Sequence, residues 1–169
     1  MNSADMTPVD WAKRPIVEKY ADFSGRAPRA EYWWYTLAMV IVLVVLTIIE
    51  SLTGLRRMVF GMYGPLTVLL WLATIVPGFA VTVRRLHDTN RSAWWLLLLV
   101  PYLLVIVASI AAVRSGGGLM ALGAVGILSL VGMVGAIVLI VFMCLPSTPG
   151  DNRYGPNPYG EGDRAVAAE

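Results

Sequence analysis

Four long apolar runs, separated by short polar segments, dominate the pattern of the chain. Each run has about the 20 apolar residues that a helix needs to cross the hydrocarbon core of a bilayer. Proline within the second and third runs does not change this, because membrane helices tolerate it. The pattern therefore predicts an all-α membrane protein with four transmembrane helices. The runs cover residues 33–53, 65–84, 94–113 and 119–145.

The segment before the first run mixes charged and apolar residues. Ile16, Tyr20 and Phe23 recur at i, i+4 and i+7, the spacing of one helical face. This spacing predicts a short amphipathic helix that lies in the membrane interface. We expect no cleavable signal peptide, since no apolar segment precedes the first run. The predicted organisation is an N-terminal segment (1–23), a four-span membrane domain with its polar connections (24–158) and a disordered tail (159–169).

Basic residues are divided unequally between the two sets of connections. Ten of the thirteen Lys and Arg residues lie before the first run, between the end of the second run and the start of the third, or after the fourth run. Short connections rich in Lys and Arg stay on the cytoplasmic side, so both termini are expected to be cytoplasmic. Tryptophans at the cytoplasmic ends of the first and third runs would then act as membrane-interface anchors. These anchors are Trp33, Trp34, Trp94 and Trp95.

Composition supports a bilayer environment and excludes several classes of function. The chain is 57% hydrophobic and 14% charged, with a mean hydropathy of +0.68 and a net charge of only +2. Such a small charge excess gives no reason to expect a nucleic-acid partner. The single cysteine, Cys144, excludes an intrachain disulfide and a CxxC metal site. We expect neither a metal nor a cofactor.

Three polar segments carry the candidate chemistry, and the orientation argument places all of them on the cytoplasmic side. Because they share one membrane face, their side chains can meet in space. Arginines interleaved with acids at helix ends form charge-assisted hydrogen bonds readily. The predicted cluster consists of Arg26, Arg29, Glu31, Arg84, Arg85, His87, Asp88, Arg91, Asp151, Asn152 and Arg153.

Two pairings are expected within this cluster. Arg84 and Asp88 are four residues apart, so they would form an i, i+4 pair if the second span continues as a helix. Glu31 lies just inside the first span, where an unpaired carboxylate is costly, so an arginine partner is expected. Arg85 or Arg91 is the predicted partner.

Several functions are compatible with such a cluster. It could be a structural clasp that holds helix ends together, or a site for anionic lipid headgroups, small anions or a protein partner, since arginine binds phosphate well. Catalysis by His87 with Asp88 is the least favoured, because neighbouring helical residues point in different directions and no nucleophile is specified. We predict a non-enzymatic role. A small channel or transporter is the alternative, disfavoured because no ionisable residue lies near the middle of a span.

The fourth run is rich in glycine, and its small residues allow two interpretations. Gly117 and Ala121, like Gly132 and Ala136, are four residues apart, a spacing that lets helix backbones approach closely. Packing within one chain is the favoured interpretation. A homo-oligomer interface through this span is the alternative.

The polar segments also resemble a known family. The motifs are Gly-Arg-Ala…Arg…Glu-Tyr-Trp at residues 25–33, Arg-Arg-Leu-His-Asp…Ser-x-Trp-Trp at 84–95, and Asn-Arg-Tyr-Gly-x-Asn-Pro at 152–158. Together, over residues 15–158, they resemble the domain-of-unknown-function family 805, which includes the YhaH-like inner membrane proteins of bacteria. The resemblance implies a small multi-spanning inner-membrane protein and implies no activity. Pro28 departs from the basic or polar residue expected at its position.

Overall fold

The computed structural model describes residues 6–57, 63–114 and 119–159. The regular elements within these ranges are helices, and four helical stretches are long and apolar enough to cross a membrane. This confirms the all-α class and the four predicted spans. The chain forms two compact units, one containing the residues up to Asn90 and again from Pro146, the other containing Arg91–Leu145.

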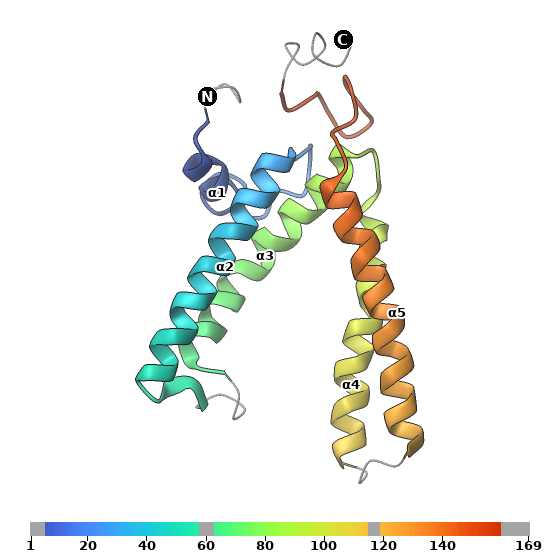
Figure 1. The fold of residues 1–169 in the computed structure, drawn as a ribbon. Helices are drawn as coiled ribbons and strands as arrows, with labels where there is room; N and C mark the ends of the chain where they lie inside the picture. The colour runs from blue at the N-terminus through green and yellow to red at the C-terminus, as the bar shows by residue number, and fades with distance from the viewer. Residues whose placement is uncertain (1–5, 58–62, 115–118, 160–169) are drawn as a thin grey trace. The chain divides into compact units, whose positions relative to one another are not determined.

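The first unit is built on two long helices that lie side by side (Figure 1). A shorter helix near the N-terminus packs against both of them, and a single 3-10 turn follows the first long helix. In chain order the elements are α1 (Pro8–Val17), α2 (Arg29–Leu52), η2 (Leu55–Arg57) and α3 (Pro65–Asp88).

Both long helices extend beyond the apolar runs. α2 begins four residues before the predicted span, at Arg29, and α3 continues four residues past it, to Asp88. Hydropathy detects only the apolar turns, whereas the polar turns at these ends are also helical. Asn90 then adopts a left-handed conformation with φ of 56°, which ends the helical path. The candidate residues around positions 29–31 and 84–88 are therefore held on rigid helix ends.

The helix in the N-terminal segment is placed differently from the prediction. α1 starts at a capping box in which the side chain of Thr7 accepts from the backbone N–H of Asp10 and that of Asp10 accepts from Thr7. It ends at Val17, so Tyr20 and Phe23 lie beyond it and do not share a helical face with Ile16. The expected i, i+4, i+7 face is therefore wrong, although a helix is present. Residues 160–169 of the predicted disordered tail lie outside the described residues.

Pro77 leaves a backbone acceptor open in the middle of α3. Proline has no N–H to donate to the carbonyl four residues earlier, which here is that of Ala73. The hydroxyl of Tyr20 donates to this carbonyl at 2.7 Å, and the hydroxyl of Tyr35 donates to the next one, of Thr74, at 3.4 Å. These contacts fix the chain after α1 against α3 and keep the helix continuous through the proline.

The far ends of α2 and α3 are joined by a buried acid. Glu50 is almost fully buried, and its carboxylate accepts from Thr67 through the backbone N–H at 2.9 Å and the hydroxyl at 2.7 Å. Gly64, the N-cap residue of α3, has no side chain to supply these bonds. A Cβ there would lie 2.0 Å from the carboxyl carbon of Glu50. Glu50 therefore caps α3 from a different helix, and glycine makes the space for it.

The second unit pairs a glycine-rich α-helix with a helical stretch that begins as a 3-10 helix and continues as an α-helix. Pro101 falls in the first α-helical turn, where its missing N–H costs nothing. A Cβ at Gly135 would lie 2.6 Å from the carbonyl oxygen of Leu98, and one at Gly132 would lie 3.1 Å from the ring of Tyr102. These glycines thus pack against the same chain. The elements are η3 (Ala93–Leu99), α4 (Val100–Arg114) and α5 (Leu119–Cys144).

Gly117 and the side chain of Ala121, the other predicted pair of small residues, lie outside the described residues.

Large apolar side chains are exposed along all four membrane-length helices. Soluble monomers rarely expose continuous apolar surfaces of this extent, whereas lipid-facing helices do. The four predicted anchor tryptophans are among these exposed side chains. The chain is therefore a multi-pass membrane protein.

Candidate functional site

A network of charged side chains gathers where α2 begins and α3 ends. Its members come from α1, from the connection that follows it, from α2 and from α3. All except Arg14 are buried, with side chains 0–1% exposed in every ion pair they form. We call these six residues the charge network: Arg14, Arg26, Glu31, Arg84, Arg85 and Asp88.

One half of the charge network is centred on Glu31. Its Oε1 accepts from Nη1 of Arg84, and its Oε2 lies 3.2 Å from Nη1 of Arg14 on α1. The expected pairing of Glu31 with an arginine of another segment is present, but the choice of Arg85 or Arg91 is wrong. Nε of Arg84 also donates to the carbonyl of Asp22 at 2.9 Å. Its Nη2 is buried and has no hydrogen-bond partner among the described residues.

The other half is centred on Asp88. Its Oδ1 accepts from Nε of Arg26 at 2.9 Å, and its Oδ2 accepts from Nη1 of Arg85 and from the hydroxyl of Ser147 at 2.5 Å. The expected i, i+4 pair of Arg84 with Asp88 is wrong. Consecutive helical residues point about 100° apart, so Arg84 and Arg85 serve different acids.

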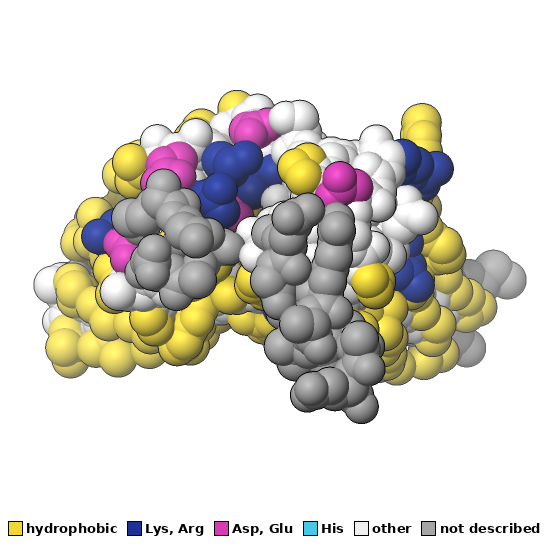
Figure 2. Space-filling model, turned by 90° about the horizontal axis from the view of Figure 1, so that it is seen from above, with side chains coloured by type: hydrophobic (Ala, Val, Ile, Leu, Met, Phe, Trp, Pro, Cys, Tyr) yellow, Lys and Arg dark blue, Asp and Glu magenta, His cyan; other side chains and the backbone are white. Residues whose placement is uncertain are grey.

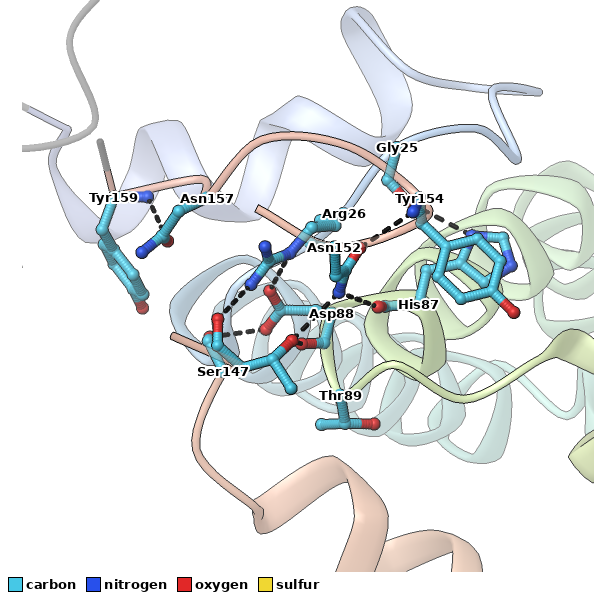
Figure 3. Close-up of polar contacts among 12 residues, drawn as sticks. Gly25, Arg26, His87, Asp88, Thr89, Ser147, Asn152, Tyr154, Asn157 and Tyr159 are labelled. Carbon is cyan, nitrogen blue, oxygen red and sulfur yellow. Dashed lines mark hydrogen bonds and ion pairs between the residues drawn. The ribbon is translucent and has the colours of Figure 1, made fainter. Parts of the chain in front are cut away.

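The segment after α5 closes over the end of α3 (Figure 3). Arg26 donates from Nη1 to the carbonyl of Gly150 at 2.6 Å and from Nη2 to that of Thr148 at 2.7 Å. Thr148 in turn donates to the carbonyl of Asp88 from its N–H and its hydroxyl. The amide of Asn152 donates to the carbonyl of His87 at 2.9 Å. These bonds satisfy the carbonyls that the last turn of a helix leaves open.

His87 and Asp88 are neighbours in sequence but contact different partners. Its ring stacks on Tyr154 with centroids 3.9 Å apart, and its Nδ1 lies 3.3 Å from the carbonyl oxygen of Gly25. The guanidinium of Arg153 also lies over the Tyr154 ring, 4.7 Å from its centroid. His87 therefore fastens the tail through an aromatic contact, whereas the carboxylate of Asp88 is occupied by arginines and Ser147.

Three further members of the predicted cluster have surroundings of their own. Asp151 is exposed and accepts from the backbone of Asn157 at 3.2 Å. Arg91 belongs to the second unit, where its guanidinium lies 4.1 Å from the ring centroid of Phe142. Arg29, the first residue of α2, is exposed and forms no ion pair with any described residue. Arg29 therefore places an available positive charge beside the network.

The buried part of the charge network is rich in arginine. Among the described residues, its buried members are three arginines and two carboxylates. Figure 2 looks onto this face, where Lys and Arg side chains gather beside acidic ones. Buried charges are costly unless each is paired and hydrogen-bonded, and each of these three arginines bonds an acid.

Two titratable groups at the edge of the network are held in one protonation state. Hydrogen bonds from Ser24 and Lys19 lower the pKa of Asp22 far below its ordinary value, so this acid stays charged. Burial raises the pKa of the Tyr159 phenol, which therefore stays neutral.

Several partners of the network could not be identified from the sequence. Arg14, Ser147, Thr148 and Tyr154 each complete a contact described above. Arg14 carried a usable signal, since it lies on a short helix that directly precedes the buried acid. The residues of the tail carried none, because they lie about 60 residues from their partners in sequence and a lone serine, threonine or tyrosine marks no particular partner. Within the described ranges, no three His, Cys, Asp or Glu side chains converge to hold a metal ion.

Comparisons with known proteins agree on one family. The family model described as "Protein of unknown function (DUF805)" matches residues 20–156. Inner membrane protein YhaH of Escherichia coli strain K12 is 34% identical over 151 residues, which cover 89% of this chain and 97% of YhaH. Inner membrane protein YhaI of the same strain is 35% identical, covering 85% of this chain and 91% of YhaI. No solved structure matches the chain significantly.

Proposed function

Because the chain belongs to the DUF805 family of proteins of unknown function, whose relatives YhaH and YhaI are named inner membrane proteins, we propose that it too resides in a bacterial inner membrane. Its termini lie in the cytoplasm. There the charged end of α2 and α3 binds anionic lipid headgroups of the cytoplasmic leaflet, without catalysis. The distribution of basic residues supports this orientation.

The observation that carries this proposal is the exposed Arg29 at the edge of the arginine-rich network. The donors of Arg26 are consumed by Asp88 and the tail, and Arg84 and Arg85 each bond an acid. The network itself therefore serves mainly to hold the connection between α1 and α2, and the segment after α5, against the end of α3. Arg29, at the edge of the network, is exposed and meets phosphate at the membrane surface.

The N-terminal segment supports the same placement. α1 buries Trp11 and Pro15 against the long helices, while Val9 and Val17 on its outer surface are exposed. Phe23, beyond the helix, is exposed as well. A short helix with exposed apolar side chains and nearby lysines fits the boundary between headgroups and acyl chains. α1 would then lie in the interface and bring the basic face of the protein to the phosphates.

The orientation is testable with single cysteines. In a Cys144→Ser background, Asp151→Cys on the tail and Arg114→Cys at the end of α4 both provide exposed thiols. We expect a membrane-impermeant maleimide to label Arg114→Cys in intact spheroplasts, and to label Asp151→Cys only after the membrane is permeabilised. The reverse pattern would place the charge network on the periplasmic side and contradict the proposal.

Headgroup binding is testable through Arg29. We expect detergent-solubilised protein to bind phosphatidylglycerol more tightly than phosphatidylethanolamine, measured by native mass spectrometry. Arg29→Gln should weaken phosphatidylglycerol binding about fivefold, because one basic side chain near an anionic surface contributes on the order of 1 kcal/mol. Arg114→Gln is the matched control, an exposed arginine at the last turn of α4 in the second unit. Equal affinities for the two lipids, or equal losses in both variants, would refute anionic headgroup recognition.

A further inference from the structure

A groove runs between α2 and α3 within the span of both helices. Its volume is about 310 Å³, and its lining is mainly apolar. Tyr32, Thr36 and Val40 line it from α2, and Thr74, Gly78 and Thr82 line it from α3. Pockets that hold small molecules typically measure about 300–1,000 Å³, so this groove accommodates part of a lipid rather than all of it.

Four hydroxyl groups of the groove already donate hydrogen bonds within the protein. The hydroxyls of Thr36, Thr74 and Thr82 donate to carbonyls one turn earlier in their own helices, at 2.7–2.8 Å. The hydroxyl of Tyr35 donates to the carbonyl of Thr74. These side chains therefore keep no proton to donate to a ligand. Such a surface suits a hydrocarbon chain better than a polar solute.

Helical spacing connects the groove to two arginines at one end. Arg29 precedes Tyr32, Thr36 and Val40 by three, seven and eleven residues, which places it on the groove face of α2. The same three intervals separate Arg85 from the groove residues Thr82, Gly78 and Thr74 of α3. The groove therefore leads toward positive charge from both helices.

The two arginines differ in their availability. Their guanidinium groups interact electrostatically, so the two positive charges lie near one another. Arg85 is buried and bonded to Asp88, while Arg29 is exposed. An anion at Arg29 would offset the repulsion between them. The groove thus combines an apolar lining with positive charge at one end.

We propose that this groove holds one acyl chain of an anionic phospholipid whose phosphate contacts Arg29. The inference rests on the proposed headgroup binding and adds to it the path of the lipid's acyl chain along the groove. An acyl chain is the occupant because both walls belong to membrane-length helices. The threonine hydroxyls are satisfied internally, and the one available charge at the end of the groove is positive, complementary to phosphate.

The test compares tryptophan at two neighbouring positions. Val40 lines the groove and is 50% exposed, whereas Ile41 is 54% exposed and lies outside it. Val40→Trp should lower the affinity for dioleoyl phosphatidylglycerol about tenfold, because the indole displaces the chain from its packing contacts. Ile41→Trp should leave it unchanged. Binding of dihexanoyl phosphatidylglycerol, whose chains are too short to follow the groove, should be the same in both variants.

Three outcomes separate this proposal from the proposed headgroup binding. If Val40→Trp and Ile41→Trp both bind the long-chain lipid like the wild type while Arg29→Gln does not, the groove is refuted and headgroup binding stands. If Arg29→Gln changes the affinity for neither dioleoyl nor dihexanoyl phosphatidylglycerol, both proposals fail. If Val40→Trp converts a dimer into a monomer, the groove is occupied by a second copy instead.

A second variant guards against misfolding of Val40→Trp. A Cβ at Gly78 would meet only the hydroxyl of Tyr35, at the ordinary contact distance of 3.6 Å. Gly78→Leu should therefore fill the groove from the opposite wall and lower the affinity for dioleoyl phosphatidylglycerol as well. Wild-type affinity in a folded Gly78→Leu protein would overturn the acyl-chain site.

Discussion

Replacing Asp88 with alanine is expected to lower the free energy of unfolding by about 3–5 kcal/mol, the usual cost of leaving a buried charge without its partner. Two arginines lose their acid at once, because Arg26 and Arg85 both bond the carboxylate of Asp88 and all three side chains are buried. Ser147 loses its acceptor too. Denaturant or thermal unfolding in detergent measures the effect.

The matched control for Asp88→Ala is Asp151→Ala. Asp151 is an acid of the same face, but it is exposed, and among the described residues it accepts only from the backbone of Asn157. Its removal should change stability by no more than about 0.5 kcal/mol, as is usual for surface substitutions. Equal effects of the two substitutions would show that Asp88 does not organise the arginines around it.

The spans were predictable because they depend on a local property of the sequence. Each apolar run is about as long as the bilayer is thick, and its position needs no knowledge of the partners. The ends of the helices were less predictable, since the polar turns around Glu31 and Asp88 carry no hydropathy signal. The acids of these turns pair with Arg84 and Arg26, which are distant from them in sequence or on another element.

The gathering of charges at one end of the first unit was predictable, but the individual pairs were not. Placing the polar segments on one membrane face follows from the distribution of lysine and arginine. Choosing between Arg84 and Arg85 as the partner of Glu31 requires the rotation of α3 about its axis. Packing against α2 sets that rotation, which brings Arg84 rather than Arg85 to Glu31.

Contacts to the backbone were beyond prediction. Tyr20 bonds the carbonyl that Pro77 leaves open, and Arg26 bonds two carbonyls of the tail. Every residue has a carbonyl, so no residue type marks these acceptors in the sequence. Glu50 was visible as an acid at the end of a span, yet its role as a cap for α3 follows only from its contact with Thr67.

The second large effect is expected at Glu31, the other centre of the charge network. Glu31→Ala should lower the free energy of unfolding by about 3–5 kcal/mol, because it leaves Arg84 fully buried without its acid. Glu18→Ala is the control, since Glu18 is an exposed acid that pairs with the same Arg14 at 3.4 Å. An exposed pair contributes only about 0–1 kcal/mol, so this substitution should be nearly silent.

A second substitution at Arg84 tests whether the loss comes from the unpaired charge or from the missing side-chain volume. In the double variant Glu31→Met, Arg84→Met, no buried arginine lacks its acid, so stability should recover by at least half. Such recovery is the coupling energy between the two sites. It is obtained from a double-mutant cycle of the wild type, Glu31→Met, Arg84→Met and the double variant. If the losses of the single variants simply add, the contact between Arg84 and Glu31 does not stabilise the fold. The attachment of α1 through Arg14 would then have to account for the effect at Glu31.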